Sequence, residues 1–274
     1  MKTISVTGGK GGTGKSTFAT LYALKLVSNG KKVILVDADV ECPNDHLLLG
    51  AKLKKEENIL EPYPVLDEKK CIQCGRCGSV CKENAVFFVK GKYPTFLKDL
   101  CTSCGACWTA CPEKAIETKN KKTGEILSAS VQKNLWLVSG LSQINVTETG
   151  PIVRKTVHFA RQLAEKKQAD FLVIDSAAGL HCPVIAAIIG SDKVYAVTEA
   201  TPLGEHDISL ALQLIKKLGL PAEIVINKSD IGKKSFIYKI ASQMNVKIAK
   251  EIPYNRKLIE AYSKGKISSM KGLV

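Results

Sequence analysis

The chain has 274 residues, 45% of them hydrophobic, and 40 Lys and Arg residues against 26 Asp and Glu give a formal charge of +14. This composition excludes a disordered chain and allows one large or two small domains with a buried core. No apolar run approaches the length of a membrane span. The lysines are spread over the whole length without a block of five like charges, so most are expected on solvated faces. An acidic protein partner is the next explanation of the charge, and nucleic acid is not expected.

The two ends of the sequence carry no targeting signal that we recognise. A strand is expected directly after Lys2, which leaves no room for a signal peptide. The segment Lys264–Val274 is too short and too interrupted by glycine to form an amphipathic membrane anchor. A cytoplasmic protein is therefore expected, and in that compartment the ten cysteines indicate metal rather than disulfides.

A phosphate-binding loop is predicted near the N-terminus. The segment Gly8–Thr17 reads GGKGGTGKST and lies between a predicted strand, Ile4–Val6, and a predicted helix, Phe18–Val27. Its glycines allow the backbone N–H groups to point inward at the helix N-terminus, where a triphosphate fits. Lys15 would reach the β- and γ-phosphates and the Ser16 hydroxyl would ligate Mg²⁺. The expected nucleotide contacts are Gly9, Lys10, Gly11, Gly12, Thr13, Gly14, Lys15, Ser16 and Thr17.

Acidic residues follow two further predicted strands. Val33–Val36 is followed by Asp37 and Asp39, and the strand Phe171–Asp175 is followed by Gly179. Because the carboxyl ends of parallel strands face the ligand crevice, these carboxylates are expected beside the phosphate loop. The alternative is that Asp37 and Asp39 only cap loops.

The remaining strand and helix signals continue the same α/β alternation. Strands are predicted at Leu135–Val138, Val194–Thr198 and Glu223–Ile226, with helices from Thr149 to about Lys167 and from about Glu205 to Leu218. Asn227-Lys228-Ser229-Asp230 follows the last strand and spells N-K-x-D, a pattern that reads guanine in small GTPases. Ile252–Asn255, which includes Pro253, is expected to close the nucleotide site.

From about Pro62 the pattern changes and a repeat of cysteines begins. The spacing C-x2-C-x2-C-x3-C occurs twice, thirty residues apart, as Cys71, Cys74, Cys77 and Cys81 and then as Cys101, Cys104, Cys107 and Cys111. This run resembles that of bacterial two-cluster ferredoxins, in which the fourth cysteine of each run ligates the other cluster. The resemblance implies one [4Fe–4S] cluster on Cys71, Cys74, Cys77 and Cys111, and another on Cys101, Cys104, Cys107 and Cys81. Zinc is the alternative, although eight ligands in this order do not suit it. The clusters could transfer electrons, store iron and sulfur, or only hold a small domain together.

The loop sequence K-G-G-x-G-K-S-T resembles the deviant Walker A loop of the MinD/ParA/nitrogenase-iron-protein ATPases. This resemblance implies that Lys10 reaches the nucleotide of a second subunit in a homodimer. It also implies that Asp39 orients the attacking water, that Asp37 supports Mg²⁺, and that Asp175 holds Mg²⁺ through water. Gly179 would approach the γ-phosphate, and Asn227 and Lys228 would hold adenine, which favours ATP over GTP. Lys10, Lys15, Asp39 and Asp175 are thus the expected catalytic residues.

The sequence as a whole predicts a doubly wound, mostly parallel α/β sheet with an inserted α+β domain of the bacterial ferredoxin type. The expected P-loop ATPase domain comprises 1–61 and 128–274, and the insert comprises 62–127. The first functional hypothesis is an ATPase whose Mg·ATP-dependent dimer closure gates electron transfer to a partner redox or metallocofactor protein. The second is a carrier of iron–sulfur or other metal centres, and the third is a MinD-like or ParA-like positioning switch.

Two cysteines lie outside the repeat. Cys42 follows the predicted Asp37–Asp39 segment, and Cys182 follows Gly179. A lone cysteine is more often a small packed side chain than a metal ligand, but a bridging metal at either position is the alternative. The four histidines show no ligand spacing and receive no role.

Overall fold

The computed structural model describes residues 1–270, which form two compact units. The first comprises Met1–Glu57, Ile126–Leu141 and the chain from Thr149 onward; the second comprises Asn58–Glu125 and Ser142–Glu148. The sequence placed the domain boundaries at 62 and 127 and did not anticipate that 142–148 group with the second unit. In the segment considered as a membrane anchor, residues 271–274 lie outside the described residues.

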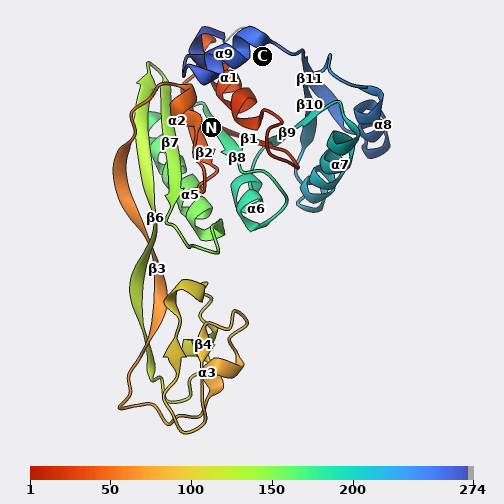
Figure 1. The fold of residues 1–274 in the computed structure, drawn as a ribbon. Helices are drawn as coiled ribbons and strands as arrows, with labels where there is room; N and C mark the ends of the chain where they lie inside the picture. Colours follow the sequence, from red (N-terminus) through yellow and green to blue (C-terminus); the bar gives the residue numbers. More distant parts are fainter. Residues whose placement is uncertain (271–274) are drawn as a thin grey trace. The chain divides into compact units, whose positions relative to one another are not determined.

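The first unit is built on a parallel sheet with helices on both faces (Figure 1). Its strands follow the order β11-β10-β9-β1-β8-β2-β7, and the same sheet continues with β6 and β3, whose residues belong partly to the second unit. From β11 to β7 every neighbouring pair of strands is parallel, and the two-residue connection from β6 to β7 requires an antiparallel pair. The expected α/β fold with a mostly parallel sheet is therefore confirmed. The strands are β1 (Lys2–Thr7), β2 (Val33–Ala38), β3 (Lys54–Leu66), β6 (Ile116–Gln132), β7 (Leu135–Ser142), β8 (Phe171–Ser176), β9 (Lys193–Glu199), β10 (Ala222–Asn227) and β11 (Lys247–Ile252).

The fully buried strand β2 shows how the two helical layers are separated. Val33 and Leu35 belong to the same apolar cluster as the residues of α1 (Lys15–Ser28). Because side chains alternate along a strand, Ile34 and Val36 point to the opposite face, where α5 (Gly150–Lys167) contacts β2 and α6 (Cys182–Ile188) contacts β8. Such continuous apolar runs are typical of parallel strands covered on both sides.

Further helices complete the first unit. They are α2 (Asp45–Leu48), α7 (Pro202–Lys217), α8 (Ser235–Met244), α9 (Arg256–Ser263) and the 3₁₀ turn η2 (Ile267–Met270). The helix α7 begins with a side-chain cap, since the Thr201 hydroxyl accepts a hydrogen bond from Gly204 N at 3.0 Å. The sequence did not predict α2, α6, α8 or α9 as separate helices, nor β3, β6 and β11.

The second unit repeats one backbone pattern twice. Its elements are α3 (Arg76–Ser79), the antiparallel hairpin of β4 (Val86–Phe87) and β5 (Thr95–Phe96), η1 (Lys98–Leu100) and α4 (Ala106–Thr109). Gly75 and Gly105 precede α3 and α4 with φ of 74° and 87°. Its buried core is small and contains Cys77, Val86, Cys107 and Ile116.

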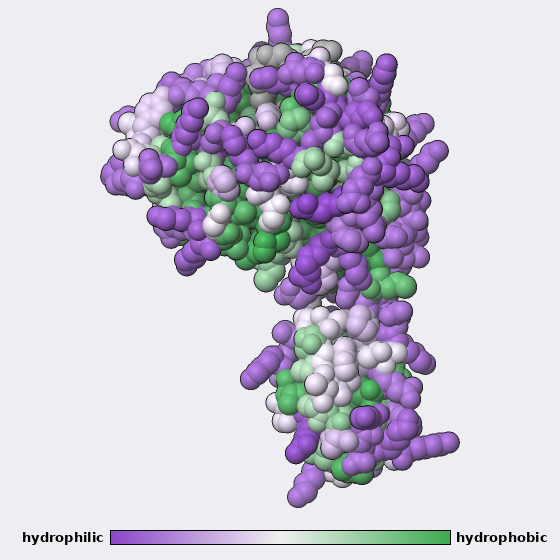
Figure 2. Space-filling model, turned by 180° about the vertical axis from the view of Figure 1, so that it is seen from behind, coloured by the Kyte–Doolittle hydropathy of each residue, from purple (hydrophilic) through white to green (hydrophobic). Residues whose placement is uncertain are grey.

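The surface is mixed in character. Hydrophilic side chains cover much of the face in Figure 2, with smaller apolar areas between them. Among the described residues, none of the helices combines the length and the apolar character that a membrane crossing requires.

Candidate functional site

A nucleotide-sized cavity opens in the first unit where the phosphate loop meets the ends of the strands. Its volume, including space open to solvent, is about 1060 Å³. Six parts of the chain line it: the phosphate loop with the start of α1, the segments after β2, β8 and β11, the end of β10 with the residue that follows it, and α9. The lining residues are Gly11, Gly12, Gly14, Lys15, Ser16, Thr17, Asp39, Asn44, Ala178, Asn227, Lys228, Pro253, Tyr254, Asn255, Leu258, Ile259 and Tyr262.

The phosphate loop is packed tightly at its start and is open in the middle. A Cβ atom on Gly9 would lie 2.6 Å from the Asp207 carbonyl oxygen, whereas a Cβ on Gly11 or Gly12 would meet no atom within 4 Å. The loop is thus fixed to the protein at Gly9 and free to contact a ligand at Gly11 and Gly12. Gly12 has a φ of 80°, a backbone conformation that favours glycine.

Lys15 is the buried cation of the cavity, with 7% of its surface exposed. Its Nζ donates a hydrogen bond to the Lys10 carbonyl oxygen at 3.1 Å. Burial lowers the pKa of Lys15, and the charges of Asp175 and Asp39 oppose that effect. The ammonium therefore lies between the loop backbone and the carboxylates, where a phosphate group would complete its coordination.

The side chain of Lys10 lies against Glu199, at the end of β9. The Lys10 Nζ is 3.9 Å from Glu199 Oε2, and Lys228 Nζ is 2.6 Å from Glu199 Oε1. One carboxylate thus contacts a lysine of the phosphate loop and a lysine of the opposite end of the cavity. Glu199 was not predicted from the sequence, although it lies at the carboxyl end of a parallel strand, as Asp37 and Asp175 do.

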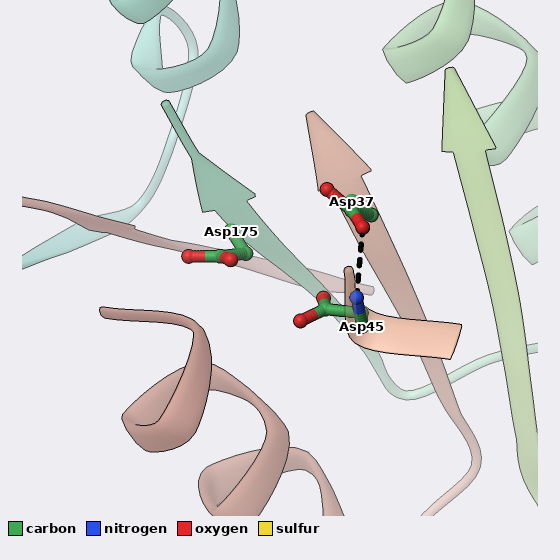
Figure 3. Close-up of side chains that lie close together, drawn as sticks. All are labelled: Asp37, Asp45 and Asp175. Carbon is green, nitrogen blue, oxygen red and sulfur yellow. Dashed lines mark hydrogen bonds between the residues drawn. The ribbon is translucent and has the colours of Figure 1, made fainter. Parts of the chain in front are cut away.

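Three buried carboxylates lie together behind Lys15 (Figure 3). They are Asp37, Asp175 and Asp45, and one oxygen from each lies within 4.8 Å of the others. Asp37 accepts hydrogen bonds from the backbone N–H groups of Asn44, Asp45 and Asp39. It therefore fixes the segment between β2 and α2. Asp45 was not predicted, because nothing in its local sequence distinguishes it from a helix-capping residue.

Burial dominates the electrostatics of these carboxylates. It raises the pKa of Asp37 to about 7, with the backbone hydrogen bonds from Asp45 and Asn44 acting in the opposite direction. Burial also raises the pKa values of Asp45 and Asp175, and the neighbouring carboxylates add to the effect. Asp39 is less buried and lines the cavity, and burial raises its pKa as well.

The segment after β8 approaches the start of the phosphate loop. Gly179 has a φ of 103°, and its N–H group donates to the Gly8 carbonyl oxygen at 3.2 Å. A side chain at this position would be strained and close to His181. Gly179 therefore allows the backbone of this segment to lie beside the loop.

The far end of the cavity is connected to the phosphate loop through Asn227. Its side-chain Nδ2 donates to the Thr13 carbonyl oxygen at 2.9 Å. The neighbouring Lys228 has a left-handed backbone with a φ of 49° and lines the cavity with Pro253. Asp230 does not line the cavity; its Oδ1 accepts the Tyr254 N–H at 2.5 Å.

Two further cavities, in the second unit, are lined by cysteines. Each has a volume of about 350 Å³, including space open to solvent, and is lined by three cysteines of one repeat and the fourth cysteine of the other. The first is lined by Cys71, Cys74, Cys77 and Cys111, and the second by Cys101, Cys104, Cys107 and Cys81. All ten cysteines are free, and Cys42 and Cys182 are exposed outside these cavities.

The cysteine cavities also contain backbone N–H groups directed at sulfur. Ala85 N donates to Cys81 Sγ and Ala115 N donates to Cys111 Sγ, each at 3.3 Å. Burial raises the pKa of Cys107 to about 11 and also raises the pKa of Cys77. A thiolate at these two buried positions is therefore unfavourable unless positive charge lies beside it.

The geometry of the first unit defines a P-loop nucleotide-binding protein. A glycine loop joins a buried strand to a helix, a lysine lies at its end, and carboxylates stand at the ends of neighbouring parallel strands.

The chain belongs to the CobQ/CobB/MinD/ParA nucleotide binding domain family (CbiA), which it matches over residues 4–268. It is therefore a nucleotide-binding ATPase of the MinD/ParA type. The sequence is 34% identical over 266 residues to an uncharacterized protein of Methanocaldococcus jannaschii, covering 97% of this chain and 90% of that protein. It is also 24% identical over 268 residues to an iron-sulfur cluster carrier protein of Rickettsia conorii, covering 96% of this chain and 64% of the relative.

Solved structures support the same fold. MinD of Pyrococcus horikoshii in complex with Mg-ADP is similar with a TM-score of 0.57 and 20% sequence identity, covering 98% of this chain and 88% of the MinD chain. A ParA family ATPase of Chlorobium tepidum is similar with a TM-score of 0.57 and 14% identity, covering 98% of this chain and 92% of that one.

Proposed function

We propose that this ATPase couples Mg·ATP binding to electron transfer through two [4Fe–4S] clusters in its second unit. The observation that carries the proposal is the composition of the two cysteine cavities. Each collects three cysteines from one repeat and one from the other, which is the ligand order of two-cluster ferredoxins. When bound, such clusters would accept and release single electrons.

The spacing of the cysteine sulfurs favours clusters over zinc. Four thiolates around one Zn²⁺ at 2.3 Å would lie about 3.8 Å apart. Among the described residues, the one group of three or more possible metal ligands within 4.8 Å is the aspartate trio, so the cysteine sulfurs are spread more widely. Four irons separate their ligands more than a single ion does. The N–H groups of Ala85 and Ala115 would stabilise the negative charge on the sulfurs that they contact.

The nucleotide is proposed to be ATP, bound with Mg²⁺. Lys15 and the open glycines would hold the phosphates, and Ser16 would ligate the metal. Asp39, which lines the cavity, would orient the attacking water. The guanine-reading alternative requires a free Asp230 carboxylate, but this carboxylate accepts the Tyr254 N–H and does not line the cavity.

A homodimer is proposed because Lys10 does not line the cavity of its own chain. Its ammonium lies 3.9 Å from Glu199 and is partly exposed, so it is available to the nucleotide of a second subunit. Closure of such a dimer would move the segments after β2 and β8, which contact the phosphate end of the cavity. After the first of these segments, α2 and the start of β3 lead into the second unit.

The decisive experiment is an EPR-monitored redox titration of anaerobically purified protein with and without Mg·ATP, alongside light scattering. Two [4Fe–4S] signals whose potentials shift as ATP causes dimerisation would support nucleotide-gated electron transfer to a redox or metallocofactor protein. Unchanged potentials and an unchanged electron-transfer rate would refute the coupling. Protein that holds zinc and no iron would refute the clusters themselves.

A second candidate is a carrier of iron–sulfur centres. The relative from Rickettsia conorii is an iron-sulfur cluster carrier protein, and Cys42 and Cys182 are exposed thiols outside the two cavities. Cys182→Ser should then abolish transfer to an apo-client while the iron of the second unit remains. Normal transfer by this variant would remove Cys182 from the proposal, and Cys42→Ser is the matched test of the other thiol.

A further inference from the structure

The short hairpin of the second unit has one buried face and one exposed face. It is formed by β4 and β5, in which Val86 pairs with Phe96 and Phe87 pairs with Thr95. Side chains point alternately to the two faces of a strand, and burial follows this alternation along both arms. The inner positions are buried or half-buried and the outer positions are exposed: Val86, Phe88, Pro94 and Phe96 on the inner face, and Phe87, Val89, Tyr93, Thr95 and Leu97 on the outer face.

The inner face of the hairpin lies against both cysteine cavities. Val86 lines one cavity and Pro94 lines the other. The Phe88 ring packs over Gly75 and leaves no room for a Cβ atom there. A protein that contacts the outer face is therefore separated from each cavity by one layer of chain.

The outer face presents large apolar side chains to solvent. Phe87 is 63% exposed, and Val89, Tyr93 and Leu97 are each more than 40% exposed. Single apolar side chains on a surface need no explanation, but an apolar patch marks an interaction site. We call this patch, together with the two turn lysines Lys90 and Lys92, the hairpin face.

The charge around this patch is of one sign. The segment 84–98 contains three lysines and no acidic residue. Lys98 lies over the Tyr63 ring, whereas Lys90 and Lys92 are exposed and form no ion pair within residues 1–270. An apolar centre with a cationic edge is complementary to a protein surface with an apolar centre and an acidic edge.

We propose that the hairpin face is the docking surface for an acidic electron-transfer protein. The inference rests on the proposed function, because it takes the two cysteine cavities as the sites of [4Fe–4S] clusters. In the docked complex a reduced cluster is oxidised by one electron and the redox group of the partner is reduced by that electron. Lys90 and Lys92 would raise the rate of encounter, and Phe87 would supply apolar area that docking buries.

The test is stopped-flow electron transfer from full-length protein, reduced with dithionite and freed of excess reductant, to two protein probes. One probe is oxidised flavodoxin, an acidic protein whose flavin takes one electron and a proton from water. The other is ferric cytochrome c, a basic protein whose haem iron takes one electron. The flavodoxin rate should fall steeply as the ionic strength rises. Lys90→Glu combined with Lys92→Glu should lower it about tenfold or more at low salt and should not lower the cytochrome c rate.

Two comparisons separate the hairpin face from the overall charge and from damage to the clusters. Lys31→Glu combined with Lys133→Glu makes the same change in net charge at two exposed lysines of the first unit, and its flavodoxin rate should stay within about threefold of wild type. Phe87→Ser should lower the flavodoxin rate about three- to tenfold without altering its salt dependence. Iron analysis and EPR show that each variant retains both clusters.

Three results would overturn the proposal. The hairpin double variant could keep the wild-type flavodoxin rate, or the first-unit control could lower that rate as much. Alternatively, Phe87→Ser could abolish self-association in light scattering and keep the flavodoxin rate, which would assign the face to a second copy of this chain.

Failure of the proposed function gives different results. Wild-type protein without iron, or with clusters that reduce neither probe, would refute electron transfer itself, and the docking surface with it. Cluster potentials that do not respond to Mg·ATP would refute only the nucleotide coupling and would leave the comparison of hairpin variants as it stands.

Discussion

Substitution of Gly14 by alanine tests how the phosphate loop is held to the far end of the nucleotide cavity. Gly14 has a φ of 93°, which costs a non-glycine residue about 1–2 kcal/mol. The new Cβ would also lie 2.2 Å from Asn227 Nδ2, so the amide must move away and lose its bond to the Thr13 carbonyl oxygen. That bond contributes about 1 kcal/mol. The expected loss of unfolding free energy is therefore about 2–3 kcal/mol.

The neighbouring glycines provide graded controls. Gly12→Ala carries the same backbone penalty without a steric contact and should cost only about 1–2 kcal/mol. Gly11→Ala meets no atom within 4 Å and has no left-handed φ, so its stability should equal that of the wild type. The assay is urea unfolding of nucleotide-free, full-length protein followed by circular dichroism. Equal losses at Gly12 and Gly14, or no loss at Gly14, would refute the role of the Asn227 contact.

Three further predictions follow from the cavities and their surroundings. Cys74 and Cys111 line the same cavity, so Cys74→Ser and Cys111→Ser should each lose about half of the iron, and the variant with both substitutions should lose no more than either one. Cys81 lines the other cavity, so Cys74→Ser combined with Cys81→Ser should lose both centres. Iron analysis and EPR check this, and additive loss at Cys74 and Cys111 would contradict the shared cavity. Glu199→Gln should weaken ATP binding about three- to tenfold, because Lys228 loses its charged partner; calorimetry measures this, and an unchanged affinity argues against the contact. Burial and the adjacent Tyr195 raise the pKa of Tyr22 in the folded protein, so folding favours the neutral phenol. The stability that this gives is present below about pH 10 and is lost as the pH rises further. Tyr22→Phe should therefore move the midpoint of alkaline unfolding to higher pH, and an unchanged midpoint would contradict this.

The parts of the site that the sequence predicted depend on local patterns. The phosphate loop and Asp175 lie where a strand passes directly into a glycine turn, so a few consecutive residues specify both structure and chemistry. Asp45 and Glu199 escaped prediction because their roles depend on which strands become neighbours. No spacing along the chain reveals that β2 pairs with β8, the pairing that brings Asp37 opposite Asp175.

The missed elements have a similar explanation. The strand β3 reads KKEENILEPYPVL, and its two prolines and five charged residues argue against a strand. Its pairing within the sheet overrides these local preferences. The helix α9 has only eight residues, and its start is fixed by the Asn255 side chain, which accepts the Leu258 N–H at 3.1 Å. A single capping bond of this kind is a weak signal in a sequence without a long apolar stripe.

The hydrogen bond from Lys15 to the Lys10 carbonyl oxygen has a consequence for nucleotide exchange. A buried ammonium that lost its phosphate partner would otherwise stand unpaired, and the cost of that state would slow product departure. Here the loop itself supplies an acceptor at 3.1 Å, so the vacated lysine is already satisfied. We therefore expect conformational release, rather than the electrostatic cost of an unpaired ammonium, to set the rate of nucleotide exchange.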